Sequence, residues 1–268
     1  MPGDCATTIT SGTSCPTLRS MGDFAEKIFT RAAPFRMTPP QKSRLIWLRR
    51  PPRLTPSSIP FVPSAEPEKV DEAWKGLVQR NPRMTDGPCW HVVGVHRDGH
   101  GGATIHLTRT TYRMGAVRGV GISTGFVGLG TKAIALCGGR LLIGKRAAAC
   151  ATYPSHWEFA PGGAVEPDED PARGIERELM EECALRPITP PRAIALLFDA
   201  SCSNWEIVHE LAIDALPDAP PNWEYSSLCL IDGVELPTPV SPCALSMMAI
   251  AQRVLSAPRN PSESNTRR

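Results

Sequence analysis

No stretch of the sequence is both long and apolar enough to cross a membrane as a helix. A span needs about 18 to 20 consecutive apolar residues, and the nearest candidate, residues 117–136, is interrupted by Arg118, Thr124, Thr131 and Lys132. The first residues also lack the charged head, apolar run and cleavage site of a secretory signal. We therefore expect a cytoplasmic protein that makes no membrane contact.

Paired cysteines and an excess of charge of one sign are also absent. The 268 residues include nine cysteines but no Cys-x-x-Cys motif, which predicts reduced thiols and excludes a zinc ribbon or a disulfide framework. The formal net charge is only +2, which argues against a protein built to coat nucleic acid. The length and the ordinary hydrophobic fraction predict a globular core domain with an added lobe.

Acidic residues are scarce in the first 62 positions, which are instead rich in Ser, Thr, Pro and Arg. This composition predicts a disordered extension over residues 1–40. Two alternatives stay open: a basic targeting peptide, and a natural start at Met21 or Met37. A disordered tail is expected over residues 258–268.

The region between residues 41 and 119 is expected to form a small α+β lobe. Residues 43–50 read as a short strand, and residues 66–80 have the apolar spacing of a helix. The segments 89–97 and 103–111 have strand character, and the turn Asp-Gly-His-Gly-Gly between them predicts a hairpin. The buried side of the helix is expected to carry Val70, Trp74, Leu77 and Val78.

Residues 120–257 have the element pattern of a larger α/β domain. A second hairpin is predicted through Gly138-Gly139, a central helix follows at 171–185, and Ser241-Pro242 caps a last helix. This last helix is expected to present Leu245, Met248, Ala251 and Leu255 on one side. The predicted strands are 128–137, 140–146, 192–199, 205–216 and 228–231.

The central helix carries three carboxylates on one arc of its surface. Glu178, Glu181 and Glu182 stand at i, i+3 and i+4, where like charges repel by about 0.2–0.5 kcal/mol per pair and oppose the helix dipole. Such a cluster is explained if it binds a cation. Asp170 and Pro171 read as the N-cap and the first-turn proline of this helix. An apolar stripe beside the acidic arc predicts its packing face: Ala172, Ile175, Leu179 and Cys183.

The segment from residue 163 to residue 185 resembles the Nudix box, the signature of the Nudix hydrolases. That pattern is a Gly, five residues, Glu, seven residues, Arg-Glu, an aliphatic residue, any residue, Glu-Glu, any residue, Gly and an aliphatic residue. The single departure is Ala184, where the family has Gly, which affects the exit of the helix and leaves the acidic cluster intact. The matching positions are Gly163, Glu169, Arg177, Glu178, Leu179, Glu181, Glu182 and Leu185.

The resemblance implies an α/β fold, the Nudix α/β/α sandwich with a mixed sheet, here preceded by the small N-terminal lobe. It implies an enzyme that hydrolyses a phosphorus-containing anhydride with Mg²⁺ or Mn²⁺, ions that prefer oxygen ligands. Glu178 and Glu182 would be the principal ligands, Glu181 would be a further ligand or hold a water molecule, and the backbone carbonyl of Gly162 would be the ligand that is not a side chain. Arg177 would hold Glu169 or Glu178 in place.

Other candidate substrate-binding residues lie outside the box. Lys145 and Arg146, at a strand end, are candidates for phosphate contact, although they could equally be solvated charges. Glu206 and Glu224 are candidates for the extra carboxylate that many Nudix enzymes use, and a solvated role is the alternative for each.

Histidines and aromatic residues offer weaker hypotheses. A zinc role is open for the histidines of the first hairpin and its turn, but strand geometry alone would not gather them. Some aromatic residues could stack on a nucleobase, with core packing as the alternative. The histidines are His91, His96, His100 and His106, and the aromatic residues are Trp90, Tyr112, Phe126 and Trp157.

A weaker resemblance suggests the substrate. The N-terminal lobe is similar to that of the UDP-glucose diphosphatase group of Nudix hydrolases, although the Gly-Thr-Asn usual after the Tyr-Arg pair is missing. The resemblance implies a role for Tyr112 and Arg113 in binding a nucleoside diphosphate-linked small molecule, with UDP-sugars first. The similar positions are Trp74, Asn81 to Met84, Asp86 to Pro88, Tyr112, Arg113 and Gly128 to Gly130.

Two rival functions stay open. One is a hydrolase for ADP-ribose, dinucleoside polyphosphates or an oxidised nucleotide, and the other is a Nudix-like regulatory module without catalysis. Such modules typically lose box glutamates, all of which are present here. No nucleic-acid partner is expected, and a homodimer is one option for the assembly.

Overall fold

The structure is a computed structural model that describes residues 44–216 and 222–257. The expectations for residues 1–40 and 258–268 lie outside these ranges. None of the helices in the described ranges has the length and apolar character to span a membrane. The described residues belong to one compact unit.

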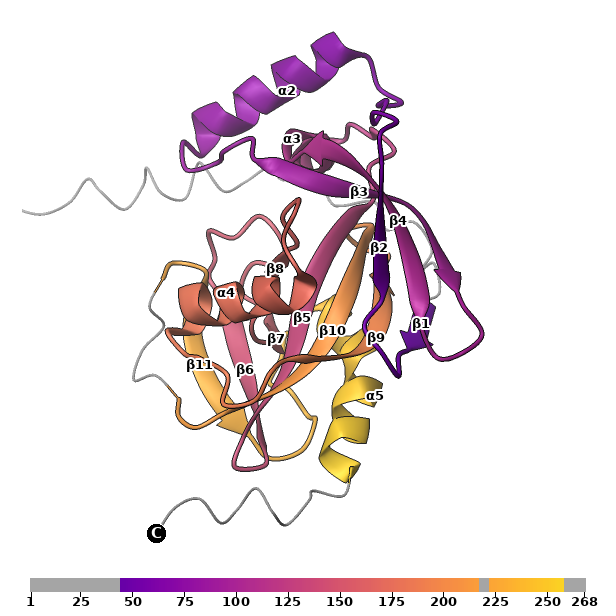
Figure 1. The fold of residues 1–268 in the computed structure, drawn as a ribbon. Helices are drawn as coiled ribbons and strands as arrows, with labels where there is room; N and C mark the ends of the chain where they lie inside the picture. Colours follow the sequence, from indigo (N-terminus) through magenta and orange to yellow (C-terminus); the bar gives the residue numbers. More distant parts are fainter. Residues whose placement is uncertain (1–43, 217–221, 258–268) are drawn as a thin grey trace, which may run out of the picture. The chain divides into compact units, whose positions relative to one another are not determined.

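An 11-stranded mixed sheet organises the fold (Figure 1). Its main path runs β1-β9-β10-β5-β3-β4-β2, while β6, β7, β8 and β11 pair off this path. The pairs β10·β5 and β2·β4 are parallel, and the other pairs are antiparallel. The strands are β1 (Arg44–Trp47), β2 (Arg53–Ser57), β3 (Pro88–Arg97), β4 (Ala103–Thr111), β5 (Gly128–Cys137), β6 (Arg140–Arg146), β7 (Trp157–Phe159), β8 (Gly162–Ala164), β9 (Arg192–Asp199), β10 (Asn204–Ile213) and β11 (Tyr225–Ile231).

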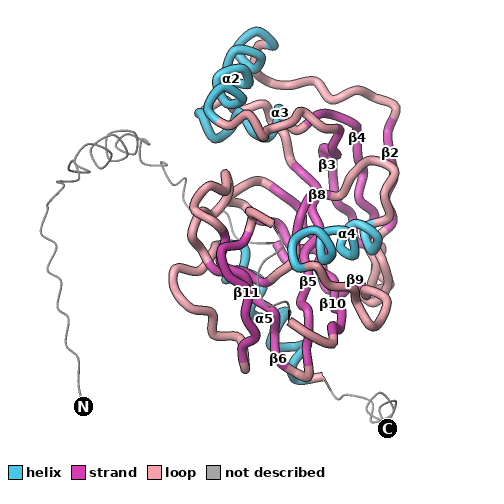
Figure 2. Tube along the Cα trace, turned by 90° about the vertical axis from the view of Figure 1, so that its left-hand side faces the viewer, coloured by secondary structure: helices cyan, strands magenta, loops and turns pink. Residues whose placement is uncertain are grey.

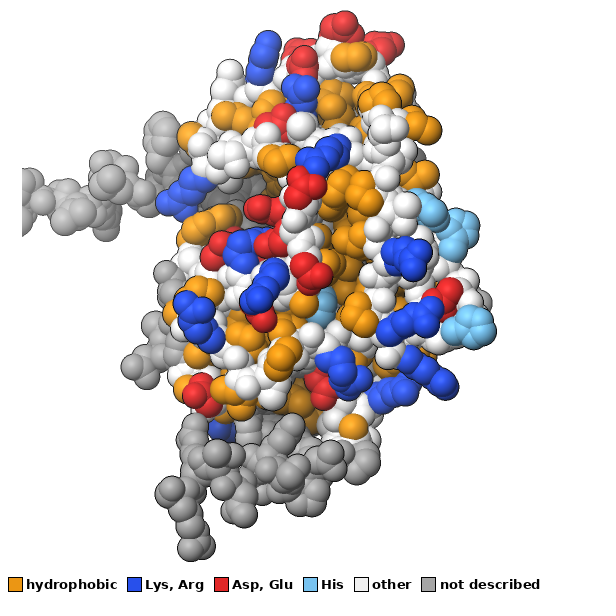
Figure 3. Space-filling view, viewed as in Figure 1, with side chains coloured by type: hydrophobic (Ala, Val, Ile, Leu, Met, Phe, Trp, Pro, Cys, Tyr) orange, Lys and Arg blue, Asp and Glu red, His pale blue; other side chains and the backbone are white. Residues whose placement is uncertain are grey.

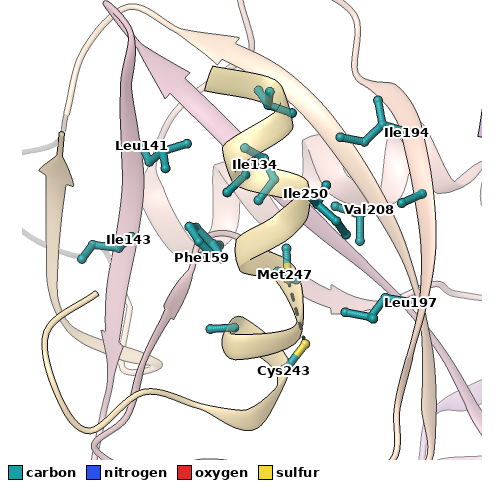
Figure 4. Packing of buried hydrophobic residues seen from close by; sticks show 14 of the residues in the cluster. Ile134, Leu141, Ile143, Phe159, Ile194, Leu197, Val208, Cys243, Met247 and Ile250 are labelled. Atoms are coloured by element: carbon teal, nitrogen blue, oxygen red, sulfur yellow. Dashed lines mark hydrogen bonds between the residues drawn. The ribbon is translucent and has the colours of Figure 1, made fainter. Parts of the chain in front are cut away.

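Two helices cover opposite faces of the sheet, as Figures 1 and 2 show together. Helix α4 (Pro171–Cys183) buries Ile175 and Leu179 against one face, and α5 (Pro242–Ser256) buries Met247 and Ile250 against the other. Figure 4 shows the second of these packing layers, in which α5 lies over residues of β5, β6, β7, β9 and β10. The remaining helical elements are α2 (Pro67–Arg80), α3 (Arg113–Ala116) and the 3-10 helix η1 (Val117–Val120).

The N-terminal strands extend the same sheet. β3 pairs with β5 at His91 and Gly128, and β1 pairs with β9 along its whole length. A single apolar cluster crosses this junction and includes Ile105 and Leu107 of β4 together with Ile207 of β10. The residues expected to form a separate lobe therefore share a core with the rest of the fold.

The fold class predicted from the sequence is confirmed: the chain is a mixed α/β fold with helices on both sheet faces. Both predicted hairpins are present, and the predicted helices at 66–80, 171–185 and after Ser241-Pro242 all form. The strands β2, β7 and β8 were missed. These strands are short, and both β2 and the segment before β8 contain proline. The alternation of apolar and polar residues that predicts a strand is therefore missing there.

Two details differ from the expectation. The buried face of α5 is formed by Cys243, Ala244, Met247, Ile250, Ala251 and Val254. Of the residues expected on this face, Ala251 is buried, whereas Leu245 is 55% exposed. The helical spacing was correct, but the sequence did not indicate which apolar residues face the sheet. The strand expected over 205–216 ends at Ile213.

Candidate active site

The site lies where two neighbouring strands of the sheet separate. β5 and β6 pair only at their turn, Leu136 with Leu141 and Cys137 with Arg140. Above that point β8 pairs with β5 and β7 pairs with β6, so the segment 157–164 fills the opening between them. This arrangement brings Gly162 beside Lys132 of β5 and under the last turns of α4.

Local sequence determines where α4 begins and ends. The side chain of Asp170 accepts a hydrogen bond from the Ala172 N–H at 2.8 Å, and Pro171 occupies the first turn. At the other end Ala184 adopts a left-handed conformation with φ 53°, which lets the Leu185 N–H reach the Leu179 carbonyl at 3.3 Å. The packing of Leu179 against the sheet then turns the acidic arc toward the opening.

Arg177 organises the acidic residues of the box. Its guanidinium makes a bidentate contact with Glu169 at 2.9 and 3.1 Å, and it also donates to Glu178 Oε1 at 2.8 Å. A longer contact of 3.4 Å reaches Glu181, and the Ala164 carbonyl accepts at 3.1 Å. One arginine therefore joins the loop before the helix to two carboxylates on it. Figure 3 shows acidic and basic side chains gathered around α4.

Glu182 and Glu178 are buried carboxylates whose hydrogen bonds and neighbouring positive charges do not fully offset the cost of burying their charge. Glu182 Oε2 accepts the Gly162 N–H at 2.9 Å, but Oε1 is buried without a partner among the described residues. Burial raises the pKa of Glu182 well above its ordinary value, although Lys132 acts to lower it. Burial also raises the pKa of Glu178 to about 6, against the opposing charge of Arg177. Both groups are thus in positions where a cation would stabilise their charged form.

The Gly-Gly pair is required by the close approach of these side chains. A Cβ at position 163 would lie 2.1 Å from Glu178 Oε1, and a Cβ at position 162 would lie 2.2 Å from Lys132 Cδ. Both distances are far below van der Waals contact. The glycines therefore let the backbone of β8 lie directly against the acidic cluster.

A second charged network lies next to the first. Glu158 of β7 is only 2% exposed and contacts Lys132 Nζ at 3.1 Å and Arg146 at 3.1 Å, while the Tyr225 hydroxyl donates to it at 3.1 Å. Burial acts to raise the pKa of Glu158, but Lys132 and Arg146 hold it below the ordinary value. Burial acts to lower the pKa of Lys132, and Glu158 and other acids raise it above its usual range. Both residues of this pair are therefore charged.

Sequence analysis missed Lys132 and Glu158. Each had a local signal, because Lys132 is the one charged residue in the otherwise uncharged segment 128–137 and Glu158 stands between Trp157 and Phe159. A lone charge in an apolar strand indicates a buried ion pair or a site. The partner, however, is 26 positions away and could not be read from the sequence.

The types of side chain in the site are suitable ligands for a divalent cation. The acidic arc offers oxygen donors, which suit Mg²⁺ or Mn²⁺, and Glu182 Oε1 is a buried oxygen without a hydrogen bond. Within residues 44–216 and 222–257, no three acidic, histidine or cysteine side chains are gathered closely enough to enclose an ion. Glu178 is instead held by Arg177, so binding an ion would require these carboxylates to shift toward it.

The structure brings only some of the other candidates to this site. Arg146 lies 3.8 Å from Glu224 as well as contacting Glu158, so it joins the site with Glu224. The charge of Glu224 also contributes to the raised pKa of Glu178 and Glu182. Lys145 is half-buried in β6 and has no ion pair with the described residues.

Two other candidates have hydrogen-bond or ion-pair partners outside the acidic arc. Arg113 pairs with Asp71 at 2.8 Å and with Asp86 at 3.3 Å, so its guanidinium ties α2 to the following loop. Glu206 is 5% exposed on the sheet face that α5 covers, where Asn204 donates to its Oε1 at 2.7 Å. Its role as the extra carboxylate of the site stays a prediction. Burial raises its pKa, and the charge of Lys132, which pairs with Glu158, acts on it by lowering that pKa.

The histidines of the first hairpin do not form a metal site in the described structure. His91 Nδ1 accepts the Val127 N–H at 3.0 Å, and the ring centroids of His96 and His106 lie 5.1 Å apart, without a third potential ligand among the described residues. Of the aromatic candidates, Trp90 is buried in the core, and Trp157 packs against the cluster under α5. Tyr112 is exposed.

Comparison with protein-family models identifies a domain within the chain. Residues 129–212 match the NUDIX domain model, and the match contains the acidic helix and the strands on both sides of it. Residues 129–212 are a Nudix domain. The matched part is about a third of the chain, and a comparison with curated protein sequences finds no significant match.

Several solved structures are similar to the chain over about half of its length. A MutT Nudix hydrolase from Burkholderia pseudomallei is 22% identical, with a TM-score of 0.37, over 47% of this chain and 95% of that one. A Nudix hydrolase from Nitrosomonas europaea is 23% identical, with a TM-score of 0.38, over 48% and 73% of the two chains. An ADP-ribose pyrophosphatase from Streptococcus suis is 15% identical, with a TM-score of 0.37, over 49% and 93%.

The match to the NUDIX domain supports a pyrophosphohydrolase, an enzyme that hydrolyses a phosphorus-containing anhydride. Divalent metal use is general in this family.

Proposed function

We propose that this Nudix hydrolase cleaves the diphosphate bond of a nucleoside diphosphate joined to another group, with Mg²⁺ or Mn²⁺ bound by the acidic helix. The observation that carries the proposal is the buried Glu182 Oε1, which has no hydrogen-bond partner among the described residues and lies in an arc of three carboxylates. A buried carboxylate oxygen without a partner costs about 1–3 kcal/mol or more. A bound cation would remove that cost.

Glu178, Glu182 and Glu181, with the Gly162 carbonyl, would hold the ion. When bound, the ion supplies charge neutralisation of the diphosphate and acidification of the attacking water. Arg177 keeps Glu169 and Glu178 oriented through its hydrogen bonds.

Arg146 and Lys145 are proposed to contact the phosphates. The Arg146 side chain is largely buried between Glu158 and Glu224, which fixes its position before substrate arrives. A guanidinium held in this way presents donors to an anionic oxygen without a large ordering cost. Lys145 is the neighbouring charge at the same strand end.

UDP-sugars are the first substrates to test, with UMP and sugar 1-phosphate as products. The similarity of the N-terminal lobe to the UDP-glucose diphosphatase group supports this choice. The seven described cysteines are free thiols, which supports a cytoplasmic setting. A homodimer stays a prediction.

The test is a panel of UDP-sugars, ADP-ribose, dinucleoside polyphosphates and nucleoside triphosphates with Mg²⁺ or Mn²⁺, scored by released phosphate products. Glu182→Gln should lower kcat/KM at least about 100-fold, because it removes a charged ligand and keeps the shape. Glu176→Gln is the matched control, since Glu176 is on the same helix and pairs with Arg173. This control should stay within about threefold of the unaltered enzyme.

Three outcomes separate the hypotheses. If the enzyme hydrolyses only the UDP-sugars, the result supports UDP-sugars as the substrate. If it hydrolyses only ADP-ribose or another compound of the panel, that compound replaces UDP-sugars as the proposed substrate. No turnover of any member would favour a non-catalytic module. Equal activity of Glu182→Gln and the unaltered chain would remove the site from α4.

A further inference from the structure

Lys132 is a buried cation at the opening between β5 and β6. It is 9% exposed, and its ammonium lies 3.1 Å from Glu158 Oε2. A Cβ at position 162 would lie 2.9 Å from Lys132 Nζ, so the ammonium also lies against the backbone of Gly162. The Gly162 N–H in turn donates to Glu182 Oε2 at 2.9 Å. Lys132 therefore lies directly behind the acidic arc, with its charge directed to Glu158.

Glu158 holds two cations at once. While Lys132 contacts Oε2, Arg146 Nη1 donates to Oε1 at 3.1 Å, and the Tyr225 hydroxyl donates to the same oxygen at 3.1 Å. The side chains of Lys132, Arg146 and Glu158 are only 11%, 13% and 3% exposed. Two positive charges and one negative charge thus share one buried group, which leaves one positive charge in excess.

The surroundings of Arg146 show which cation can serve a ligand. Its Nε donates to the Thr152 carbonyl at 3.0 Å, and its guanidinium lies over the Tyr225 ring at 5.9 Å from the centroid. Glu224 approaches Nη1 only to 3.8 Å, and Nη2 makes no hydrogen bond with the described residues. Arg146 is therefore fixed in place and still has donors for an anion.

The loop before β11 joins Arg146 to the acidic helix. Asn222 Nδ2 donates to the Glu181 carbonyl at 2.9 Å, and Asn222 Oδ1 accepts the Glu224 N–H at 2.8 Å. Glu224 is also the residue that approaches Arg146. A diphosphate bound through cations at the acidic arc would therefore have Arg146 beside it.

We propose that Lys132 is a positioning residue that neutralises Glu158, so that the charge of Arg146 stays available to a phosphate. Lys132 and Glu158 are neutral as a pair. Without Lys132, Arg146 would be the one cation hydrogen-bonded to a buried carboxylate, and a phosphate would have to compete with Glu158 for it. This inference rests on the proposed function for the contact between Arg146 and phosphate, and it gives Lys132 no contact with the substrate.

Calorimetric titration of the full chain with methylenediphosphonate, a diphosphate analogue that resists hydrolysis, tests the proposal at saturating Mg²⁺. Lys132→Met should weaken binding roughly 10- to 100-fold, because the charge of Arg146 is then taken by Glu158. The double variant Lys132→Met/Glu158→Gln should bind within about fivefold of the unaltered chain, since a neutral pair is removed as a unit. Lys69→Met is the control for removing a paired lysine, because Lys69 contacts Glu66 at 2.9 Å on the surface, and it should change binding by less than about twofold.

Two further measurements separate positioning from a loss of structure or of metal. Circular dichroism at the temperature of the titration should show that each variant is folded. Mn²⁺ binding without the diphosphonate, followed by electron paramagnetic resonance, should not be weakened in either Lys132 variant, because Lys132 is not a ligand. If Lys132→Met fails to fold, the double variant decides alone: binding within about fivefold supports the proposal, and a loss of about tenfold or more overturns it.

Several other results would overturn the proposal. Unchanged diphosphonate binding in Lys132→Met would do so, as would an equal loss in the single and the double variant, which would mean that Lys132 contacts the anion itself. An equal loss of Mn²⁺ binding, or failure of the unaltered chain to bind the diphosphonate, would also overturn it. The outcome is separable from the hydrolysis test. The expected binding pattern without turnover of any compound removes the proposed reaction alone, whereas turnover with an unchanged KM in Lys132→Met removes this inference alone.

Discussion

Glu206 is a carboxyl group in surroundings that oppose its ionisation. Burial raises its pKa to about 7, against the lowering effect of Lys132 and of the hydrogen bond from Asn204. Its Oε2 has no partner in the described structure. The folded protein therefore binds a proton here between about pH 4.5 and 7, where the unfolded chain does not.

The pH dependence of Glu206→Gln follows from this difference. An acid whose folded pKa is raised destabilises the folded state as pH rises through that window. The variant should be as stable as the unaltered protein near pH 4.5 and more stable at pH 8, by up to about 3 kcal/mol. Urea unfolding at several pH values measures this difference.

Glu210→Gln is the control for this prediction. Glu210 lies in the same strand but pairs with Arg192 at the edge of the fold. Its substitution should change stability by less than about 1 kcal/mol at pH 4.5 and at pH 8. If Glu206→Gln increased the free energy of unfolding equally at pH 4.5 and at pH 8, the raised pKa of Glu206 could not be the cause of the increase.

At the scale of the element, α4 begins with a favourable N-cap and ends at a residue in an unfavourable backbone conformation. Asp170 caps the first turn, whereas Ala184 holds the left-handed conformation that the family box assigns to glycine. The left-handed region costs a residue with a Cβ about 1–2 kcal/mol. The last turn keeps its hydrogen bonds in spite of this cost, because Leu179 and Cys183 are packed into the core.

Ala184→Gly should therefore stabilise the protein by about 1 kcal/mol, since glycine adopts this conformation freely and loses part of the gain to backbone entropy. Chemical denaturation provides the measurement. Ala257→Gly is a matched control at the end of α5, where φ is −69° and glycine offers no advantage. A loss of stability in Ala184→Gly would show that the exit loop depends on the Ala184 side chain.

At the scale of the whole molecule, the Nudix domain and the preceding strands share one core. The match to the family covers residues 129–212, yet Ile105 and Leu107, fully buried in β4, pack in the same cluster as Leu129 and Ile207. The predicted boundary between 41–119 and 120–257 remains untested. We propose that the two parts unfold together.

Leu107→Ala tests this proposal. Removing a fully buried leucine side chain costs about 2–5 kcal/mol. If the core is shared, this loss of stability should shift a single unfolding transition to lower denaturant concentration. Far-UV circular dichroism and tryptophan fluorescence should then report the same transition. Leu211→Ala, in the cluster under α4, should move the same transition. A separate early transition in Leu107→Ala alone would establish an independent lobe.

The sequence by itself determined the features that depend on short-range spacing. The acidic arc of α4, its Asp170 cap and the two hairpins all follow from residues a few positions apart, because helix and turn geometry are set locally. The register of the box was enough to indicate the Nudix family. Arg177 could likewise be assigned to the acidic network, since its partners lie one to eight positions away.

Only the tertiary structure decided which charges are buried and what they contact. Lys132 pairs with Glu158, and Glu206 is enclosed on the sheet face under α5. Each of these depends on which sheet face is covered and on how β5 and β6 separate. Such long-range pairing leaves no periodic trace in the sequence, because the energy of a buried charge depends on neighbours that folding brings together.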